Sequence, residues 1–239
     1  VPLAEYNPLE CIKTNIYGAS NIVTAAVDAK VKKVIALSTD KAVNPINLYG
    51  ATKLCMEKIF IDGNAISGHN STRFSIVRYG NVLSSRGSII PLIEKLKKEN
   101  KKQIPLTDDK MTRFFINLEE AVKFVISSFQ IMDKGEIFIP KMPSVFIKDL
   151  MKSIYSEGEI KIIGIRPGEK IDELLISKDE CADAYELKNG YALIPQKLYF
   201  KSSLKMKLKK VKLIFEYNSR DNQNFLKREQ IKKLLQSIS

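Results

Sequence analysis

A short apolar run followed by a cluster of chemically active side chains is the feature that most constrains this chain. Residues 34–37 read Val-Ile-Ala-Leu and have polar residues on both sides, which predicts a buried strand of a parallel sheet over 33–39. The run ends on four polar side chains, Ser38, Thr39, Asp40 and Lys41. Open α/β sheets bind ligands outside the carboxyl ends of their strands, so these side chains stand where chemistry is expected.

A second signal follows a Pro-Asn turn, where a helix is expected to open near Tyr49. Tyr49 and Lys53 are four residues apart and therefore share one helix face. A cation near the phenol favours its anion, so Tyr49 is a candidate base near neutral pH. Tyr-x-x-x-Lys alone is a weak signal that also fits a surface helix pair, and Ser-Thr-Asp-Lys alone fits a loop or a helix cap. Only their combination with a buried strand points to catalysis.

The stretch S-T-D-K-A-V-N-P-I-N-L-Y-G-A-T-K resembles the extended short-chain dehydrogenase/reductase superfamily. Within it, the stretch is similar to the UDP-N-acetylglucosamine 4,6-dehydratases that invert C5, the enzymes that start pseudaminic acid synthesis. Tyr49 supports that small soluble branch, because membrane-anchored and C5-retaining relatives carry methionine there. Further similar segments lie at residues 5–19, 78–88, 111–115, 162–170 and 216–219. The likeness covers nearly the whole chain and is weakest over about 196–214.

The resemblance implies a catalytic set of five residues, Thr39, Asp40, Lys41, Tyr49 and Lys53. Tyr49 would take the proton of the C4 hydroxyl, with Thr39 hydrogen-bonded to the C4 oxygen. Lys53 would keep Tyr49 ionised and contact the nicotinamide ribose. Once C4 is a ketone, the C5 proton is acidic, and Asp40 and Lys41 would supply the acid and the base that remove water across C5 and C6.

The substrate contacts implied by the resemblance are mostly arginines, whose guanidinium groups match diphosphate geometry. Arg113 and Arg166 are the expected UDP contacts, and Asn81 and Arg86 are expected nearer the sugar and the inner phosphate. Glu169 completes the set. The alternatives are arginines paired with surface carboxylates, and a Glu169 that caps a helix.

The cofactor expected from the resemblance is NADP, although NAD stays open. Asn15, in T-N-I-Y-G, would lie near it together with Tyr49 and Lys53, with a buried polar cap as the alternative for Asn15. No G-x-G-x-x-G or G-x-x-G-x-x-G string occurs in the sequence, although a dinucleotide fold needs such a turn. The chain opens on Val-Pro, as the family does after its fourth strand. We therefore expect the sequence to begin partway through the fold.

Alternating elements predict an α/β fold with a parallel sheet. Expected strands cover 33–39, 73–79, 104–107, 112–116, 136–140 and 160–165. Expected helices cover 8–29, 49–64, 88–98, 118–132, 146–155 and 169–176. By resemblance the fold is the C-terminal part of a Rossmann-type sheet with helices on both faces, plus a smaller interleaved substrate-binding lobe. The expected domains are the remainder of the dinucleotide-binding domain (1–85), mainly the substrate-binding lobe (86–196) and a basic C-terminal segment (197–239).

Composition excludes several other classes. The net charge is +12, but +9 of it falls in residues 197–239, which favours a lysine-protected edge or a phosphate site over nucleic-acid binding. Three scattered cysteines and one histidine indicate a reducing cytoplasm without disulfides or a metal site. No apolar stretch reaches the ~18 residues of a membrane span. The resemblance also implies a homo-oligomer.

Three functions stay open from the sequence. The first is a UDP-sugar 4,6-dehydratase, the second is a UDP-sugar 4-epimerase, and the third is an inactive fragment or basic binding module. Asp40 and Lys41 favour the dehydratase over the epimerase, because epimerisation at C4 needs neither a C5 base nor a C6 acid.

Overall fold

The structure is a computed structural model that describes residues 2–68, 72–83, 85, 88–195, 202–212 and 214–236. The chain divides into two interleaved units. Unit 1 comprises residues 1–79, 122–141 and 174–216, and unit 2 comprises residues 80–121, 142–173 and 217–239. The chain passes between the units several times, and residues 197–239 are divided between them. The expected three-part division by function stays a prediction.

Unit 1 is built on one mixed sheet. In spatial order its strands are β1 (Lys33–Thr39), β2 (Arg73–Tyr79), β6 (Ile137–Pro140), β11 (Gly190–Leu193), β10 (Ala184–Leu187) and β12 (Lys209–Lys210). The first three are parallel, and the last three continue the sheet with antiparallel pairs. The expected strands 33–39 and 73–79 are confirmed, and their register sets Thr39 beside Tyr79 at the carboxyl ends.

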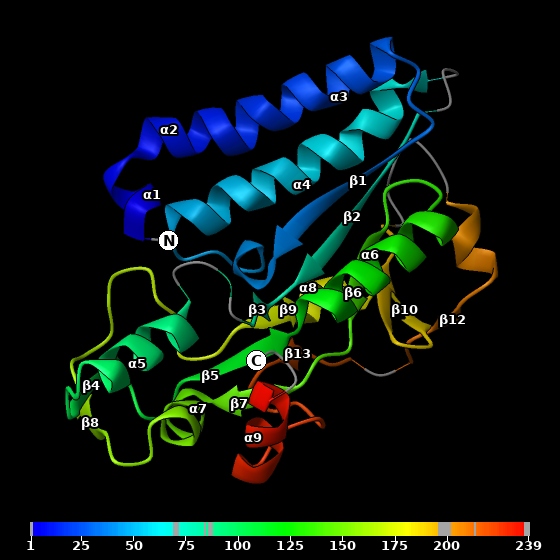
Figure 1. Ribbon diagram of the computed structural model, residues 1–239. Coiled ribbons are helices and arrows are strands. Elements are labelled where there is room, and N and C mark those ends of the chain that lie inside the picture. Colours follow the sequence, from blue (N-terminus) through cyan, green and yellow to red (C-terminus); the bar gives the residue numbers. More distant parts are fainter. Residues whose placement is uncertain are drawn as a thin grey trace. The chain divides into compact units, whose positions relative to one another are not determined.

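Two long helices run side by side over one face of this sheet (Figure 1). They are α3 (Gly18–Asp28) and α4 (Leu48–Ile66), and the segment before α3 consists of α1 (Pro2–Tyr6), α2 (Pro8–Ile12) and the π-helical turn η1 (Lys13–Tyr17). Helix α4 packs closely on β2, because Gly63 lies against the ring of Phe74 and the Phe60 and Phe74 ring centroids are 6.2 Å apart. A helix over 8–29 was expected, and the structure adds the π-helical turn in its middle.

The other face of the sheet packs against α6 (Leu118–Ile131). Phe124 and Val125 of α6 join a cluster with Val77, Phe138 and Tyr185 from three strands. The remaining elements of unit 1 are the 3-10 turn η2 (Asp40–Ala42), β9 (Leu174–Ile176), α8 (Lys178–Cys181) and the 3-10 turn η4 (Ser203–Met206). Successive strand residues point to opposite faces, so β2 serves both layers.

Unit 2 is smaller and has its own core. Its elements are β3 (Asn81–Val82), α5 (Ile89–Lys98), β4 (Gln103–Leu106), β5 (Thr112–Ile116), β7 (Ser144–Phe146), α7 (Ile147–Ile154), β8 (Glu159–Ile162), β13 (Tyr217–Asn218) and α9 (Arg228–Gln236). Strands β3, β5 and β7 form one sheet, and β4 pairs with β8 in parallel. Ile93, Ile104, Phe115, Leu150 and Ile231 are buried together between these elements.

The expected helix over 169–176 is wrong. Gly168 has φ +75 and the amide of Glu169 bonds to the carbonyl of Arg166 at 3.1 Å, so a turn stands here, followed by β9. In a helix, the carbonyls of Lys170 and Ile171 would accept amides further along the same segment. Here they accept hydrogen bonds from the guanidinium of Arg113 instead. A long-range partner thus overrides the local helical pattern.

The α/β class with a parallel core sheet is confirmed. Within the described ranges, every helix is too short or too polar to cross a bilayer.

Candidate active site

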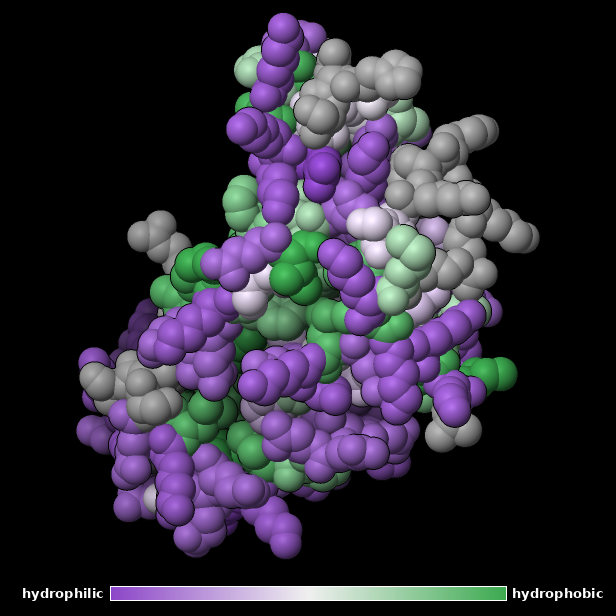
Figure 2. All heavy atoms as spheres, turned by 90° about the vertical axis from the view of Figure 1, so that its right-hand side faces the viewer, coloured by the Kyte–Doolittle hydropathy of each residue, from purple (hydrophilic) through white to green (hydrophobic). Residues whose placement is uncertain are grey.

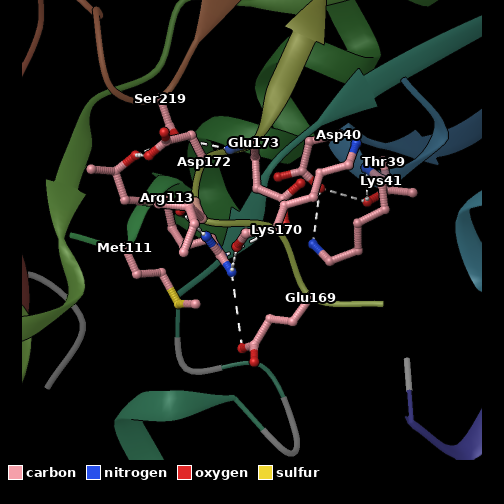
Figure 3. Close-up of polar contacts among 12 residues, drawn as sticks. Thr39, Asp40, Lys41, Met111, Arg113, Glu169, Lys170, Asp172, Glu173 and Ser219 are labelled. Carbon is pink, nitrogen blue, oxygen red and sulfur yellow. Dashed lines mark hydrogen bonds and ion pairs between the residues drawn. The ribbon is translucent and has the colours of Figure 1, made fainter. Parts of the chain in front are cut away.

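The turn at the end of β1 gathers three of the expected catalytic residues. The hydroxyl of Thr39 donates to Oδ1 of Asp40 at 2.9 Å and accepts the amide of Lys41 at 3.4 Å. The ammonium of Lys41 lies 3.0 Å from the same Oδ1 (Figure 3). Asp40 is fully buried, and its Oδ2 has no hydrogen-bond partner among the described residues. A buried carboxylate oxygen without a partner is costly, so the turn has an acceptor ready for a donor from a ligand.

Helix α4 brings Tyr49 to this turn. Asn47 caps the helix, since its side chain accepts the amide of Gly50 at 2.7 Å. A Cβ at Gly50 would collide with the carbonyl oxygen of Lys41. Glycine therefore allows the first turn of α4 to approach the backbone of η2. Tyr49 comes so close that the charges of Asp40 and Lys41 change its pKa.

Burial raises the pKa of the Tyr49 phenol above its usual 10.0, and Lys41 is the cation that opposes this increase. The charges of Asp40, Cys11 and Tyr79 add to the increase. We expected Lys53 to be the cation that favours the phenolate. The cation that acts on Tyr49 in this structure is Lys41, and the role of Lys53 stays a prediction. Burial therefore disfavours the phenolate that a base at this position needs, and the charge of Lys41 favours it.

Lys53 lies one helical turn after Tyr49. Its ammonium donates to the carbonyl of Leu37 in β1 at 2.8 Å and lies 3.0 Å from Sδ of Met56. Burial lowers the pKa of Lys53, and the charge of Glu57 opposes that decrease. Lys53 therefore contacts the backbone of β1 two residues before Thr39.

Asn15 contacts the same helix from the π-helical turn η1. Its amide donates to the hydroxyl of Thr52 at 3.0 Å, and that hydroxyl donates to the carbonyl of Tyr49 at 2.9 Å. Sγ of Cys11 lies 3.3 Å from the same hydroxyl. In this structure Asn15 supports the backbone of α4 behind Tyr49, and its contact with a cofactor stays a prediction.

Unit 2 contains a pocket of about 370 Å³. Four residues that the sequence singled out, Asn81, Arg113, Arg166 and Glu169, line it together, although they are spread over nearly 90 positions of the chain. Arg86 lies outside the described residues. Two cations and an amide in one pocket form a site suited to a phosphorylated ligand.

Arg113 holds the wall of this pocket in place. Its guanidinium donates to the carbonyls of Lys170 at 2.8 Å and Ile171 at 2.9 Å. Glu169 and Glu173 lie 4.0 and 3.6 Å from it (Figure 3). The buried Arg113 therefore shapes the turn on which the exposed Arg166 is carried.

Sequence reasoning missed the apolar part of the pocket, to which Met111, Phe115 and Met151 contribute. Their hydrophobicity alone does not separate them from ordinary core residues, so no sequence signal marked them. It also missed Arg78, a completely buried cation near the carboxyl end of β2. No group of three or more histidine, cysteine, aspartate or glutamate residues suited to a metal ion occurs in the part of the chain that the structure describes.

Several known proteins are similar to this chain. The family model described as polysaccharide biosynthesis protein matches residues 1–195. A UDP-N-acetylglucosamine 4,6-dehydratase (inverting) of Campylobacter jejuni is 52% identical over 229 residues, covering 93% of this chain and 69% of that protein. A UDP-glucose 4-epimerase of Rickettsia felis is 40% identical over 246 residues, covering 100% of this chain and 71% of that protein.

Among solved structures, Pen from Bacillus thuringiensis is similar over 100% of this chain and 72% of its own, with a TM-score of 0.89 and 37% identity. The family model covers most of the chain, and the Campylobacter jejuni relative shares more than half of the aligned residues. The chain belongs to the polysaccharide biosynthesis protein family, among the inverting UDP-N-acetylglucosamine 4,6-dehydratases.

Proposed function

We propose that this chain carries the catalytic residues of a UDP-N-acetylglucosamine 4,6-dehydratase that inverts C5. The product is UDP-2-acetamido-2,6-dideoxy-L-arabino-hex-4-ulose. The observation that carries the proposal is the contact of 3.0 Å between Lys41 and Asp40 at the turn against which the Tyr49 helix packs. The relative that is 52% identical bears the name of this activity.

The first step oxidises C4. Tyr49 accepts the proton of the C4 hydroxyl, while Thr39 orients the C4 oxygen through its hydroxyl. A nicotinamide held beside Tyr49 and Lys53 would supply the hydride acceptor for C4 and the hydride donor for C6. Lys41 favours the Tyr49 anion, and Lys53 is within one helical turn of Tyr49 to stabilise the same charge.

The second step removes water, and a single proton transfer prepares the pair for it. A proton that moves from the Lys41 ammonium to Asp40 along their contact leaves a neutral amine and a carboxylic acid. The amine then takes the C5 proton, which is acidic because C5 lies next to the C4 ketone. Asp40 gives its proton to the C6 hydroxyl, the C6–O bond breaks, and water leaves. The pair returns to its original ion-pair form. Return of the hydride to C6 would leave an enolate, and C5 would take a proton from a solvent-exchanging group on the opposite face. Tyr49 releases the proton that it took from the C4 hydroxyl, so no net acid or base is consumed.

The residues present fit the nicotinamide end of a cofactor. Tyr49 and Lys53 are placed beside the carboxyl end of a parallel strand, where such ligands bind, and Asp40 has a buried oxygen without a partner among the described residues. The residues that hold a pyrophosphate do not occur in this sequence as a glycine-rich string. We propose NADP as the cofactor by resemblance, and competition between NADP and NAD in a binding assay tests this choice.

The pocket of unit 2 is the proposed site of the UDP moiety. Arg166 would bind the diphosphate. Arg113 would support it indirectly, by holding the turn that carries Arg166. Asn81 would lie nearer the sugar. The apolar residues Met111 and Phe115 offer a surface for the base. Binding of UDP to the chain, measured by calorimetry, tests this assignment independently of catalysis.

The second candidate function is a UDP-sugar 4-epimerase, because the Rickettsia felis relative carries that name. Both reactions begin with oxidation of C4. They differ in the next step, because only the dehydratase needs Asp40 and Lys41 to remove water across C5 and C6. Product analysis with the whole natural polypeptide, NADP and UDP-N-acetylglucosamine decides between them. A 4-keto-6-deoxy sugar with inverted C5 supports the dehydratase. A product that keeps its C6 hydroxyl and differs from the substrate only at C4 would show that the enzyme is an epimerase.

A further inference from the structure

The guanidinium of Arg78, in β2, is completely buried in unit 1. Arg78 is the residue before Tyr79 at the carboxyl end of the strand, and in the sheet it lies beside Ser38, the residue before Thr39. Arginine is almost never fully buried unless it is paired, because desolvating its charge is costly. The mechanism above assigns it no role.

Each of the five N–H groups of Arg78 has an acceptor. One fork binds Glu57, with Nε to Oε1 at 3.0 Å and Nη2 to Oε2 at 2.7 Å. A second fork binds Glu180, with Nη1 to Oε2 at 3.1 Å and Nη2 to Oε1 at 2.9 Å. The remaining N–H donates to the carbonyl of Leu175 at 2.9 Å. Paired forks of this kind are the strongest and most geometrically demanding contacts that arginine makes.

The first fork acts on the catalytic helix. Tyr49, Lys53 and Glu57 follow one another at intervals of four residues on α4, so they lie on one helix face. Glu57 is completely buried and Arg78 is in the strand on which α4 packs. The two hydrogen bonds between Arg78 and Glu57 therefore fix the position of α4 along the direction of β2.

The second fork acts on the segment beside the catalytic turn. Glu180 is held in α8 by a capping box with Ser177, and Leu175 belongs to β9. Strand β9 lies against η2, which carries Asp40 and Lys41. One buried side chain is thus connected both to the helix of Tyr49 and to the segment that packs on the Asp40 turn.

We propose that Arg78 is a positioning residue for this site, holding α4 through Glu57 and the 174–181 segment through Glu180 and Leu175. The inference rests on the proposed function for the roles of Tyr49 and Lys53. It assigns Arg78 an effect on Lys53, because Arg78 neutralises the carboxylate one turn away from that lysine.

The pKa of Lys53 distinguishes this role from a contribution to stability alone, because a residue that only stabilised the fold would leave that pKa unchanged. Glu57 is the charged group that acts on Lys53, and its charge raises the pKa of Lys53 against the lowering by burial. Lys53 otherwise contacts the Leu37 carbonyl and Met56, whereas Asp40 and Lys41 act on Tyr49. Arg78→Met leaves the Glu57 charge uncompensated and should raise the pKa of Lys53. Glu57→Gln removes that charge and should lower it.

The experiment is competitive acetylation of this chain over a range of pH, with the reactivity of Lys53 followed by mass spectrometry. No substrate or cofactor is present, so the result does not depend on which reaction the enzyme catalyses. Glu57→Gln keeps the shape of the side chain and leaves Arg78 paired with Glu180, so it is the variant expected to fold if Arg78→Met does not. Arg73→Met is the matched control, since Arg73 is in the same strand and pairs with Asp133 at the surface.

We expect the reactivity profile of Lys53 to move to higher pH in Arg78→Met and to lower pH in Glu57→Gln, with the double variant between them and Arg73→Met unchanged. If Arg78→Met does not fold, the double variant takes its place, because it removes the Glu57 charge together with that of Arg78. A Lys53 profile at higher pH in the double variant than in Glu57→Gln then supports the proposal, and equal profiles overturn it. Folded variants whose Lys53 profiles stay at the wild-type position, or move in the same direction, overturn it.

Discussion

Gly50 lies directly against the carbonyl oxygen of Lys41, in a space where a Cβ does not fit. This contact sets the start of α4 against η2, which carries the proposed catalytic residues Asp40 and Lys41, and it leads to the first prediction. Gly50→Ala should push the helix from the turn, with a loss of about 1–3 kcal/mol in the free energy of unfolding. Because displacement of a catalytic group by about 1 Å can cost about 100-fold in rate, the whole natural polypeptide should lose activity far beyond its loss of stability.

Gly18→Ala in α3 is the control, since its added Cβ would meet only ordinary van der Waals contact. Thermal unfolding and initial rates measured on both variants test the prediction. Wild-type activity in Gly50→Ala would show that the close approach of α4 to η2 does not matter for catalysis.

The ionisation of Tyr49 should respond in opposite directions to its two charged neighbours. Burial raises its pKa, Lys41 lowers it and Asp40 raises it. Lys41→Met should therefore raise the pKa of Tyr49 further, so that the phenolate forms only at higher pH, and Asp40→Asn should lower it. Tyrosinate absorbance during pH titration reports the change, after subtraction of the same titration with Tyr49→Phe in each background. Shifts of the same sign in both variants would contradict this electrostatic account.

Much of unit 1 followed from the sequence, because its signals are local. The strands 33–39 and 73–79 were predicted at their observed bounds, since each is a β-rich apolar run with polar flanks. Tyr49 and Lys53 could be placed on one face because helix geometry fixes residues four apart.

The features that the sequence did not predict depend on partners far along the chain. The helix expected at 169–176 is replaced by a turn and a strand because Arg113, more than 50 positions earlier, takes its carbonyl groups. Arg78 did not stand out because its acceptors, Glu57 and Glu180, are 21 and 102 positions away. Side-chain contacts of this kind leave no periodic pattern in the sequence.

The two arginines of the unit 2 pocket should affect UDP binding in different ways. Arg166 is exposed on its turn, so Arg166→Gln should weaken UDP binding by about tenfold or more, as expected for the loss of hydrogen bonds to a charged group, without a change in unfolding temperature. Arg113→Gln should weaken binding and also lower the unfolding temperature, because it removes the hydrogen bonds that Arg113 donates to the carbonyls of Lys170 and Ile171. Calorimetry with UDP and thermal unfolding of both variants distinguish the two effects.

Arg228→Gln, an exposed arginine in α9, is the control for a general loss of positive charge. Equal UDP affinity in Arg166→Gln and wild type would remove Arg166 from the proposed diphosphate site.

The surface of unit 1 should promote self-association of this chain. Val122, Ile126 and Phe129 are 47%, 54% and 42% exposed along one side of α6, and β1 pairs with only one neighbour among the described strands. Figure 2 shows exposed apolar residues among charged ones on one face of the molecule. An open strand edge and an apolar helix face favour association. Size-exclusion chromatography should therefore show concentration-dependent oligomers that Ile126→Glu reduces.

Gln103→Glu in unit 2, which introduces the same charge at another exposed position, is the control and should leave the oligomers unchanged. A concentration-independent monomer would mean that these surfaces do not associate in solution.

The most direct test of the central claim is the reaction in heavy water. The whole natural polypeptide with NADP and UDP-N-acetylglucosamine should give a 4-keto-6-deoxy product with deuterium at C5, because the proton delivered there comes from a solvent-exchanging group. Substrate deuterated at C4 should carry that label to C6, and Lys41→Ala should abolish both outcomes. A product without deuterium at C5 that retains its C6 hydroxyl would contradict the account.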